Sequence, residues 1–238
     1  MDKNMSDQAF PDYRLFGRRQ DRPLKARQQR LMQDLLPKVA IIKDEIDQAA
    51  YKARPIWLEI GFGGGEHLAW HAARNPDVLM IGAEPFINGV AKLLAAIDEQ
   101  KLDNVRILHG DARDLLLHFP AGSVERLFVL HPDPWPKKKH HKRRIVSPLL
   151  LKEAARILSS DAEMRVASDI PDYIRWTLMH VQMHNKNSED FYWSARRKTD
   201  WADAPEDWPQ TRYEAKAIRE GRVPTYLSFR RLPQRLSP

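Results

Sequence analysis

The chain has 238 residues, no cysteine and a net charge of +7. The lack of cysteine excludes disulfides, thiolate catalysis and cysteine-based zinc sites, and no apolar run approaches the roughly 18 residues of a membrane-spanning helix. Because the first nine residues have no apolar signal core, we expect a cytoplasmic protein that has no contact with membranes.

The first 35 residues are predicted to form a basic N-terminal arm with a short helix, partly disordered, ahead of a single domain that spans residues 36–238. Residues 1–23 are polar and contain two prolines. Four residues then recur at the spacing of a helix that ends at Pro37: Leu24, Gln28, Leu31 and Leu35. Between residues 14 and 30 the chain carries seven basic residues and one acidic residue, which is typical of a surface that binds nucleic acid.

From residue 56 onward, strand and helix patterns alternate. Short apolar runs predict strands at residues 56–60, 78–84, 105–110, 124–130 and 164–167, and helical spacing predicts helices at residues 66–74, 87–97, 147–158 and 172–184. Residues 191–195 and 226–230 are predicted to pair as antiparallel strands. Successive strand–helix units indicate an α/β fold, namely a doubly wound, Rossmann-like, mostly parallel seven-stranded sheet with helices on both faces.

An acidic residue stands at the carboxyl end of each of the five parallel strands: Glu59, Glu84, Asp111, Asp133 and Asp169. Ligands of open α/β sheets bind at this edge. One such acid would be explained as a helix cap, but five together indicate a ligand crevice. Acids beside basic segments favour a cationic or hydroxyl-rich small ligand next to a polyanion.

The first strand runs into a glycine-rich turn, Glu59-Ile-Gly-Phe-Gly-Gly-Gly. It lacks the third glycine of a dinucleotide loop, where Glu66 stands, and it lacks the Gly-Lys-Ser/Thr of a phosphate loop. Glu84 lies at the spacing of a ribose-binding acid, and Asp111 suits an adenine amino group. S-adenosylmethionine, a cationic nucleoside without phosphates, meets these requirements; the alternative is a tight turn without a ligand.

The segment from Pro132 to Arg144 combines an acid, an aromatic ring and a basic cluster. Asp133 follows the predicted strand at 124–130 and precedes a rigid Pro-Trp-Pro turn, after which residues 137–144 carry six basic residues and no acid. This combination predicts chemistry on a nucleic-acid base beside bound phosphates. A solvated charged surface is the alternative for the basic run, and Trp135 could either stack on the base or pack the turn.

Six motifs together resemble the bacterial tRNA (guanine-N7)-methyltransferases, a family of class I S-adenosylmethionine-dependent enzymes. They are the glycine-rich turn, Gly82-Ala-Glu-Pro, Gly110-Asp-Ala, Pro132-Asp-Pro-Trp-Pro-Lys-Lys, His141-Lys-Arg-Arg and Thr211-Arg-Tyr-Glu. The resemblance covers roughly residues 14 to 230. It implies methyl transfer from S-adenosyl-L-methionine to N7 of guanosine 46 in the variable loop of tRNA, with S-adenosyl-L-homocysteine as the second product. It also implies a monomer or homodimer without an obligatory protein partner, and no metal.

The resemblance assigns roles to individual residues. Cofactor contacts fall on Glu59, Gly61, Gly63, Glu84, Asp111 and Asp133, and Asp133 is also the catalytic residue. Substrate contacts fall on Lys137, Asp169, Thr211, Arg212, Tyr213 and Glu214. RNA contacts fall on Lys139, His140, His141, Lys142, Arg143 and Arg144.

Guanine N7 carries a lone pair and no proton, so methylation needs no obligatory general base. Asp133 is expected either to favour the movement of positive charge onto the purine or to hold guanine by its N1 and N2 donors. Asp169 and Glu214 are candidates for reading the guanine edge, although the spacing of Thr211 and Glu214 alone favours a capping box.

Three other functions fit the same residues. The chain could methylate another RNA base or position, it could bind RNA with a degenerate cofactor pocket, or it could be the catalytic half of a two-protein enzyme. The set of strand-end acids and the glycine-rich turn argue against the second of these functions.

Overall fold

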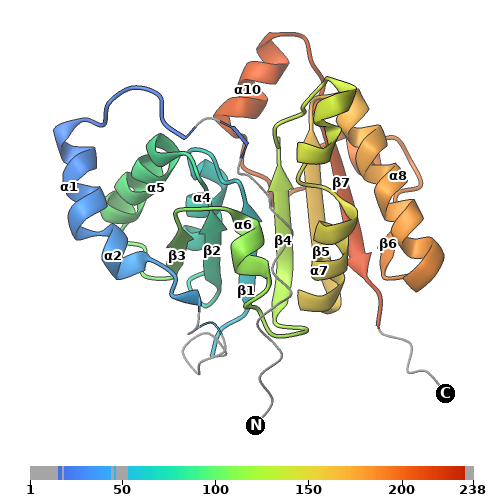
Figure 1. The fold of residues 1–238 in the computed structure, drawn as a ribbon, viewed down its shortest axis with the longest axis horizontal. Coiled ribbons are helices and arrows are strands. Elements are labelled where there is room, and N and C mark those ends of the chain that lie inside the picture. The colour runs from blue at the N-terminus through green and yellow to red at the C-terminus, as the bar shows by residue number, and fades with distance from the viewer. Residues whose placement is uncertain (1–15, 18, 44–45, 47–52, 234–238) are drawn as a thin grey trace.

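The strands are β1 (Ile56–Ile60), β2 (Leu79–Ala83), β3 (Val105–Leu108), β4 (Val124–Leu130), β5 (Leu158–Ser168), β6 (Phe191–Trp193) and β7 (Thr225–Arg231). In the computed structural model, which describes residues 16–17, 19–43, 46 and 53–233, they form one sheet in the order β3-β2-β1-β4-β5-β7-β6 (Figure 1). The first five strands in this order are parallel, and β7 runs antiparallel to β5 and β6. The predicted doubly wound sheet and its closing antiparallel pair are confirmed.

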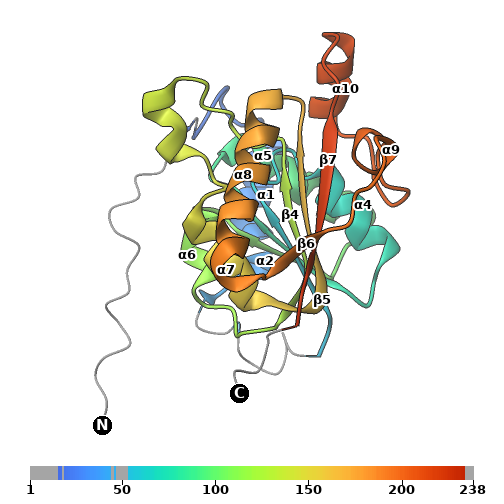
Figure 2. The same ribbon diagram turned by 90° about the vertical axis from the view of Figure 1, so that its right-hand side faces the viewer.

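The helices are α1 (Ala26–Asp34), α2 (Leu36–Val39), α4 (Glu66–Arg74), α5 (Ile87–Gln100), α6 (Ala112–Leu116), α7 (Pro148–Ile157), α8 (Pro171–Ser188), α9 (Thr199–Ala202) and α10 (Arg212–Arg219), with a 3₁₀ helix, η2, at Lys138–Arg143. Helices α4 and α5 cover one face of the sheet, and α6, α7 and α8 cover the other (Figure 2). No described helix combines the length and apolar character that crossing a membrane requires.

Side-chain alternation along β1 divides the apolar core into two layers. Leu58 packs with α7 and α8 on one face, whereas Trp57 packs with α4 and α5 on the other. This division follows from the two-residue period of a strand, since successive side chains point to opposite faces. A sheet buried on both faces presents only its ends to a ligand, which directs attention to the carboxyl edge.

The structure refines several predicted boundaries. The helix predicted to end at Pro37 ends at Asp34, and Pro37 lies in the first turn of α2, where its missing N–H costs nothing. Strand β5 begins at Leu158 rather than residue 164, and its residues 159–162, of which the first three are polar, fall where the register with β4 shifts. Helix α6 was not predicted because it has only five residues. Of the predicted basic arm and helix, residues 1–15 and 18 lie outside the described residues, and the described part includes α1.

Asn104 ties the start of β3 to the connection between α4 and β2. Its Nδ2 lies 2.9–3.0 Å from the carbonyl oxygens of Ala72, Asn75 and Val78, and the side chain is buried. Buried carbonyl groups need donors, so this one amide fixes the end of α4 relative to β2.

We predict that Asn104→Ala lowers the free energy of unfolding by about 1–3 kcal/mol, because buried acceptors lose their donor. Urea unfolding measures this change. Asp103→Ala, at the exposed neighbouring position, is the control and is expected to have little effect. Equal stabilities of the two variants would contradict the role given to Asn104.

Candidate functional site

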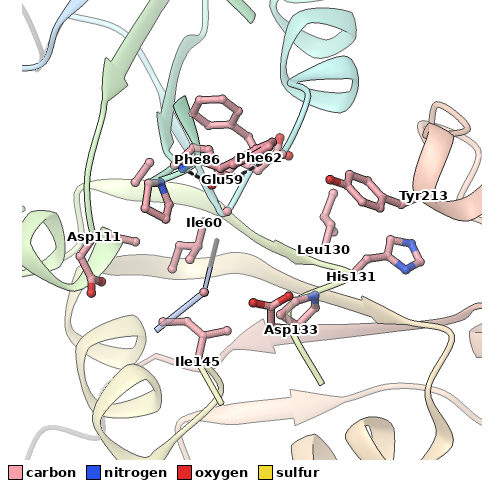
Figure 3. A pocket seen from close by; sticks show the side chains of 18 of the residues that line it. Glu59, Ile60, Phe62, Phe86, Asp111, Leu130, His131, Asp133, Ile145 and Tyr213 are labelled. Atoms are coloured by element: carbon pink, nitrogen blue, oxygen red, sulfur yellow. Dashed lines mark hydrogen bonds between the residues drawn. The ribbon is translucent and has the colours of Figure 1, made fainter. Parts of the chain in front are cut away.

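A cavity of about 360 Å³ opens at the carboxyl edge of the parallel strands. Four of the five strand-end acids line it: Glu59, Glu84, Asp111 and Asp133. Figure 3 shows Asp111 on one side of the cavity and Tyr213 on the other, with Asp133 and Ile145 in the lower part of the view. The volume is in the range of small-molecule pockets, so the predicted crevice is present and has space for a nucleoside.

The glycine-rich turn adopts backbone angles that glycine favours. Gly61, Gly63 and Gly65 have φ values of +71°, +56° and +78°. The Gly61 N–H donates to the carbonyl of Ala83 at 2.8 Å, which ties the turn to the end of β2. A Cβ at position 63 would lie 2.9 Å from the ring of Tyr213, so the chain passes close under that ring.

Glu84 holds the turn from the opposite side. Its carboxylate accepts the N–H of Gly63 at 2.7 Å and the N–H of Phe86 at 2.9 Å. Burial raises the pKa of Glu84, and the two backbone donors partly offset this rise. Each carboxylate oxygen keeps a further lone pair, so contact with a ligand hydroxyl remains open.

Gly89 lies against the glycine-rich turn, and the sequence did not predict this contact. A Cβ at this position would stand 2.0 Å from the carbonyl oxygen of Gly63, so α5 can approach the turn only with glycine there. The one sequence signal for this contact was a glycine inside a predicted helix. Such a glycine indicates that another part of the chain packs closely against the helix, but not which part.

His67 and His71 form a second feature that sequence reasoning missed. His67 Nδ1 lies 2.8 Å from Glu59 Oε2, and His67 Nε2 lies 3.1 Å from His71 Nε2. Burial, followed by the nearby His67, lowers the pKa of His71 to about 3, so His71 is neutral at pH 7. His67 thus occupies one oxygen of Glu59, a carboxylate only 2% exposed, and the second oxygen remains for a ligand.

Asp111 begins α6 and has a charged partner. Its carboxylate accepts the N–H of Arg113 at 3.0 Å as a helix cap and also binds the Arg113 guanidinium. A ligand amino group at this acid would therefore meet a carboxylate whose charge is already partly compensated.

Asp133 lies in a turn that is unusual for its residue types. His131 and Trp135, on either side of it, have φ values of +46° and +42°, although neither is glycine. Gly17 lies beside the carboxylate, since a Cβ there would stand 3.3 Å from Asp133 Oδ2. Asp133 is exposed at the mouth of the cavity, but nearby protein atoms partly shield its carboxyl from water and raise its pKa. Asp133 thus has the position and the environment expected of a residue that acts on a ligand.

Two aromatic rings and an arginine form part of the cavity wall. The Arg143 guanidinium lies 4.1 Å from the ring of Phe16 and 4.9 Å from the ring of Trp135. Behind Phe16, the Arg19 carbonyl accepts the N–H of Ile87 at 3.0 Å. The described part of the N-terminal segment is therefore seated on the rim of the cavity, and Phe16 was not among the predicted site residues.

Helix α10 places Tyr213 and Thr211 at the cavity and turns Glu214 away from it. Thr211 Oγ1 accepts the N–H of Glu214 at 3.3 Å, which is one half of the capping box. The Glu214 side chain is only 3% exposed, and it accepts hydrogen bonds from Trp208 Nε1 at 3.0 Å and from the hydroxyl of Tyr226. Burial and the carboxylate raise the pKa of Tyr226, so its hydroxyl keeps the proton that it donates. Reading of the guanine edge by Glu214 stays a prediction.

The other predicted substrate residues lie at the margin. Asp169 does not line the cavity; it binds Arg222 and lies 3.5 Å from Nδ1 of His131, which does line it. Burial raises the pKa of Asp169, but its hydrogen bonds outweigh burial, so that the pKa is lowered. Arg212 forms an ion pair with Glu66 at 3.3 Å, and Lys137 is exposed beyond the turn.

The basic run divides into four environments. Four lysines are exposed: Lys137, Lys138, Lys139 and Lys142. Arg143 lines the cavity, whereas Arg144 is buried inside the protein. The rings of His140 and His141 pack against Trp135 and Trp176. The structure therefore separates residues that the sequence presents as one cluster.

Comparison with known proteins gives three kinds of match. Residues 53–226 match a family model described as "Putative methyltransferase". The chain is 46% identical to a protein of Rhodospirillum rubrum, with 98% of this chain and 94% of that protein covered, and 55% identical to one of Ruegeria pomeroyi, with 77% and 76% covered. Both relatives bear the name tRNA (guanine-N(7)-)-methyltransferase.

Solved structures share the fold. The 16S rRNA methyltransferase KamB superposes with a TM-score of 0.56 at 18% identity, covering 79% of this chain and 93% of that one. The 16S rRNA (adenine(1408)-N(1))-methyltransferase of Catenulisporales acidiphilia gives 0.53 at 14% identity, covering 83% and 95%. At these identities the likeness extends to the fold alone.

We predict that Trp208→Phe lowers the free energy of unfolding by about 1–3 kcal/mol, because the buried Glu214 carboxylate loses a donor. Trp57→Phe is the matched control, since the buried Trp57 Nε1 has no hydrogen-bond partner among the described residues. Urea unfolding of both variants is the measurement. If Trp57→Phe were as destabilising as Trp208→Phe, the loss would belong to ring packing and not to the hydrogen bond.

Proposed function

Because this chain belongs to the tRNA (guanine-N7)-methyltransferase family and is therefore an enzyme, we propose that it methylates N7 of guanosine 46 in the variable loop of tRNA, with S-adenosylmethionine as the donor. The observation that carries this proposal is that the glycine-rich turn, three acids proposed to hold the cofactor, and Asp133 all line one cavity together with Tyr213. The identity with named relatives over almost the whole chain supports the same substrate class.

The cavity suits the proposed donor. Its five carboxylates outnumber its two arginines, which favours a cation with hydroxyl and amino groups, and its apolar part includes Ile60, Phe86 and Ile145. Glu59, Gly61, Gly63, Glu84 and Asp111 would hold the donor. When bound, it supplies an electrophilic methyl group on a positively charged sulfur.

The protein's own task is alignment and electrostatics. Guanine N7 attacks with a lone pair and releases no proton, so no side chain need act as a base. A carboxylate at Asp133 favours positive charge on the purine, or it accepts hydrogen bonds from guanine N1 and N2. Tyr213 and Trp135 line the cavity, and their rings are candidates for stacking with an unstacked base.

Phosphate binding is proposed for the exposed part of the basic run. Lys137, Lys139 and Lys142 are exposed near the cavity, and Arg143 reaches its wall. Arg19 and Arg22 extend the positive charge along the rim, whereas Arg27 is compensated by Asp98 and Glu99. Such contacts release counterions, so tRNA affinity should fall steeply with salt.

The direct test is incubation with unmodified tRNA and a labelled methyl donor. N7-methylguanosine is then mapped by alkali- and borohydride-sensitive cleavage, and we expect one site, at position 46. Methylation of another base would support a different RNA methyltransferase. Donor binding by calorimetry separates an enzyme from an RNA-binding protein, because the latter with a degenerate pocket would take up no donor.

We predict that Gly89→Ala weakens donor binding at least about tenfold, or ~1.4 kcal/mol, because its methyl group displaces the Gly63 carbonyl. Alanine raises helix propensity, so instability of α5 would not explain the loss. Gly110→Ala is the control, since a Cβ there meets Leu108 at an ordinary 3.5 Å. If calorimetry found that Gly89→Ala and the wild type bind the donor with equal affinity, the close approach of Gly89 to Gly63 would not matter for donor binding.

We predict an acid limb in the pH dependence of kcat that depends on Asp133. Protonation removes the negative charge, so kcat falls as the pH drops through the pKa of Asp133. Because burial raises that pKa, kcat begins to fall at a higher pH than it would for an ordinary aspartate, whose pKa is about 3.9. Asp133→Asn is expected to lower kcat about 100-fold and to remove the limb. Wild-type turnover in this variant would exclude both roles given to Asp133.

A further inference from the structure

Arg144 ends the basic run but does not belong to its surface. Its side chain is 1% exposed, whereas the neighbouring Lys142 is exposed and Arg143 lines the cavity. The guanidinium lies 5.0 Å from the ring of Trp176 and 5.4 Å from that of Tyr173, both on α8. A phosphate of a bound RNA would have to displace these rings to reach it.

The guanidinium connects the turn that carries Asp133 to the first turn of helix α8. Arg144 Nε donates to the carbonyl oxygen of Pro134 at 2.8 Å, and Nη2 donates to Asp172 Oδ2 at 2.5 Å. Pro134 directly follows Asp133, and Asp172 lies in the first turn of α8. The planar fork of arginine makes both bonds at once, which the single ammonium of lysine cannot reproduce.

The turn needs such an external donor. Residues 132, 134 and 136 are prolines and have no N–H, so the turn cannot stabilise itself with the usual backbone bonds. His131 and Trp135 also have positive φ values of 46° and 42°, a conformation that is unfavourable for residues other than glycine. Such a conformation persists only where surrounding contacts impose it.

The charge of Arg144 is already compensated within the protein. Asp172 forms the ion pair, and Arg144 is the largest cause of its lowered pKa. A buried, permanently charged guanidinium with a carboxylate partner has little attraction left for a phosphate.

We propose that Arg144 is a positioning residue, which holds the turn that carries Asp133 against α8, and that it makes no contact with RNA. This inference rests on the proposed function, since its catalytic readout is methyl transfer to tRNA. It predicts that neighbouring arginines of one basic run have separable roles.

The test compares Arg144→Met with Arg143→Met in the full-length protein. Turnover is measured with saturating donor and tRNA, and tRNA affinity is measured between about 50 and 200 mM salt. Arg144→Met should lower kcat on the order of 10- to 100-fold and leave the slope of log affinity against log salt unchanged. Arg143→Met should reduce the magnitude of that slope by about one.

Arg144→Lys separates charge from geometry and also serves if the methionine variant does not fold, as thermal unfolding would show. This variant keeps the positive charge, so a contact with phosphate would survive. The simultaneous hydrogen bonds to Pro134 and Asp172 would be lost. We expect a kcat at least about tenfold below that of the wild type, with an unchanged salt slope. Asp172→Asn, at a half-exposed carboxylate, should lower kcat several-fold.

Three results would overturn the inference. They are a reduced salt slope in Arg144→Met, full turnover in Arg144→Met or Arg144→Lys, and unchanged kcat in Asp172→Asn. Absence of tRNA methylation by the wild type would instead contradict the proposed function. The salt slopes would still show whether Arg144 contacts RNA.

Discussion

The pocket depends on two hydrogen bonds to one buried carboxylate. Glu84, at the end of β2, accepts the N–H of Gly63 at 2.7 Å and that of Phe86 at 2.9 Å, and so joins the turns that follow β1 and β2. A buried carboxylate without donors would be costly, so these bonds favour one arrangement of the turn. Gly89 then lies against the Gly63 carbonyl, and the wall of the pocket is set before a ligand enters.

Charge is arranged in layers around this wall. The acids lie inside the cavity, where little water screens them, and the lysines lie outside, where salt screens them strongly. Asp133 stands at the boundary between the two. Asp133 therefore lies next to both the acidic cavity and the basic surface.

Buried hydrogen-bond partners fix the positions of Thr211 and Glu214 in the Thr-Arg-Tyr-Glu motif. Thr211 caps α10, while Glu214 anchors that helix to Trp208 and Tyr226. The ring of Trp208 lies 5.3 Å from that of His67, the partner of Glu59. The end of β1 and helix α10, which border the pocket, therefore rest on one shared set of buried side chains.

The sequence by itself determined the strands, the glycine-rich turn and the gathering of acids at one edge, because parallel strands bring their carboxyl ends together whatever packs around them. It also determined the family, through motifs with specific spacing. That four of the five predicted acids line the cavity, and Asp169 does not, was decided by the tertiary structure. Only the tertiary structure decided where side chains within a motif point. Glu214 faces inward and Arg144 lies under a turn, since their partners, Tyr226 and Asp172, stand 12 and 28 residues away and meet them only when the chain packs. His67 and Gly89 entered the site in the same way, through contacts that no local pattern records.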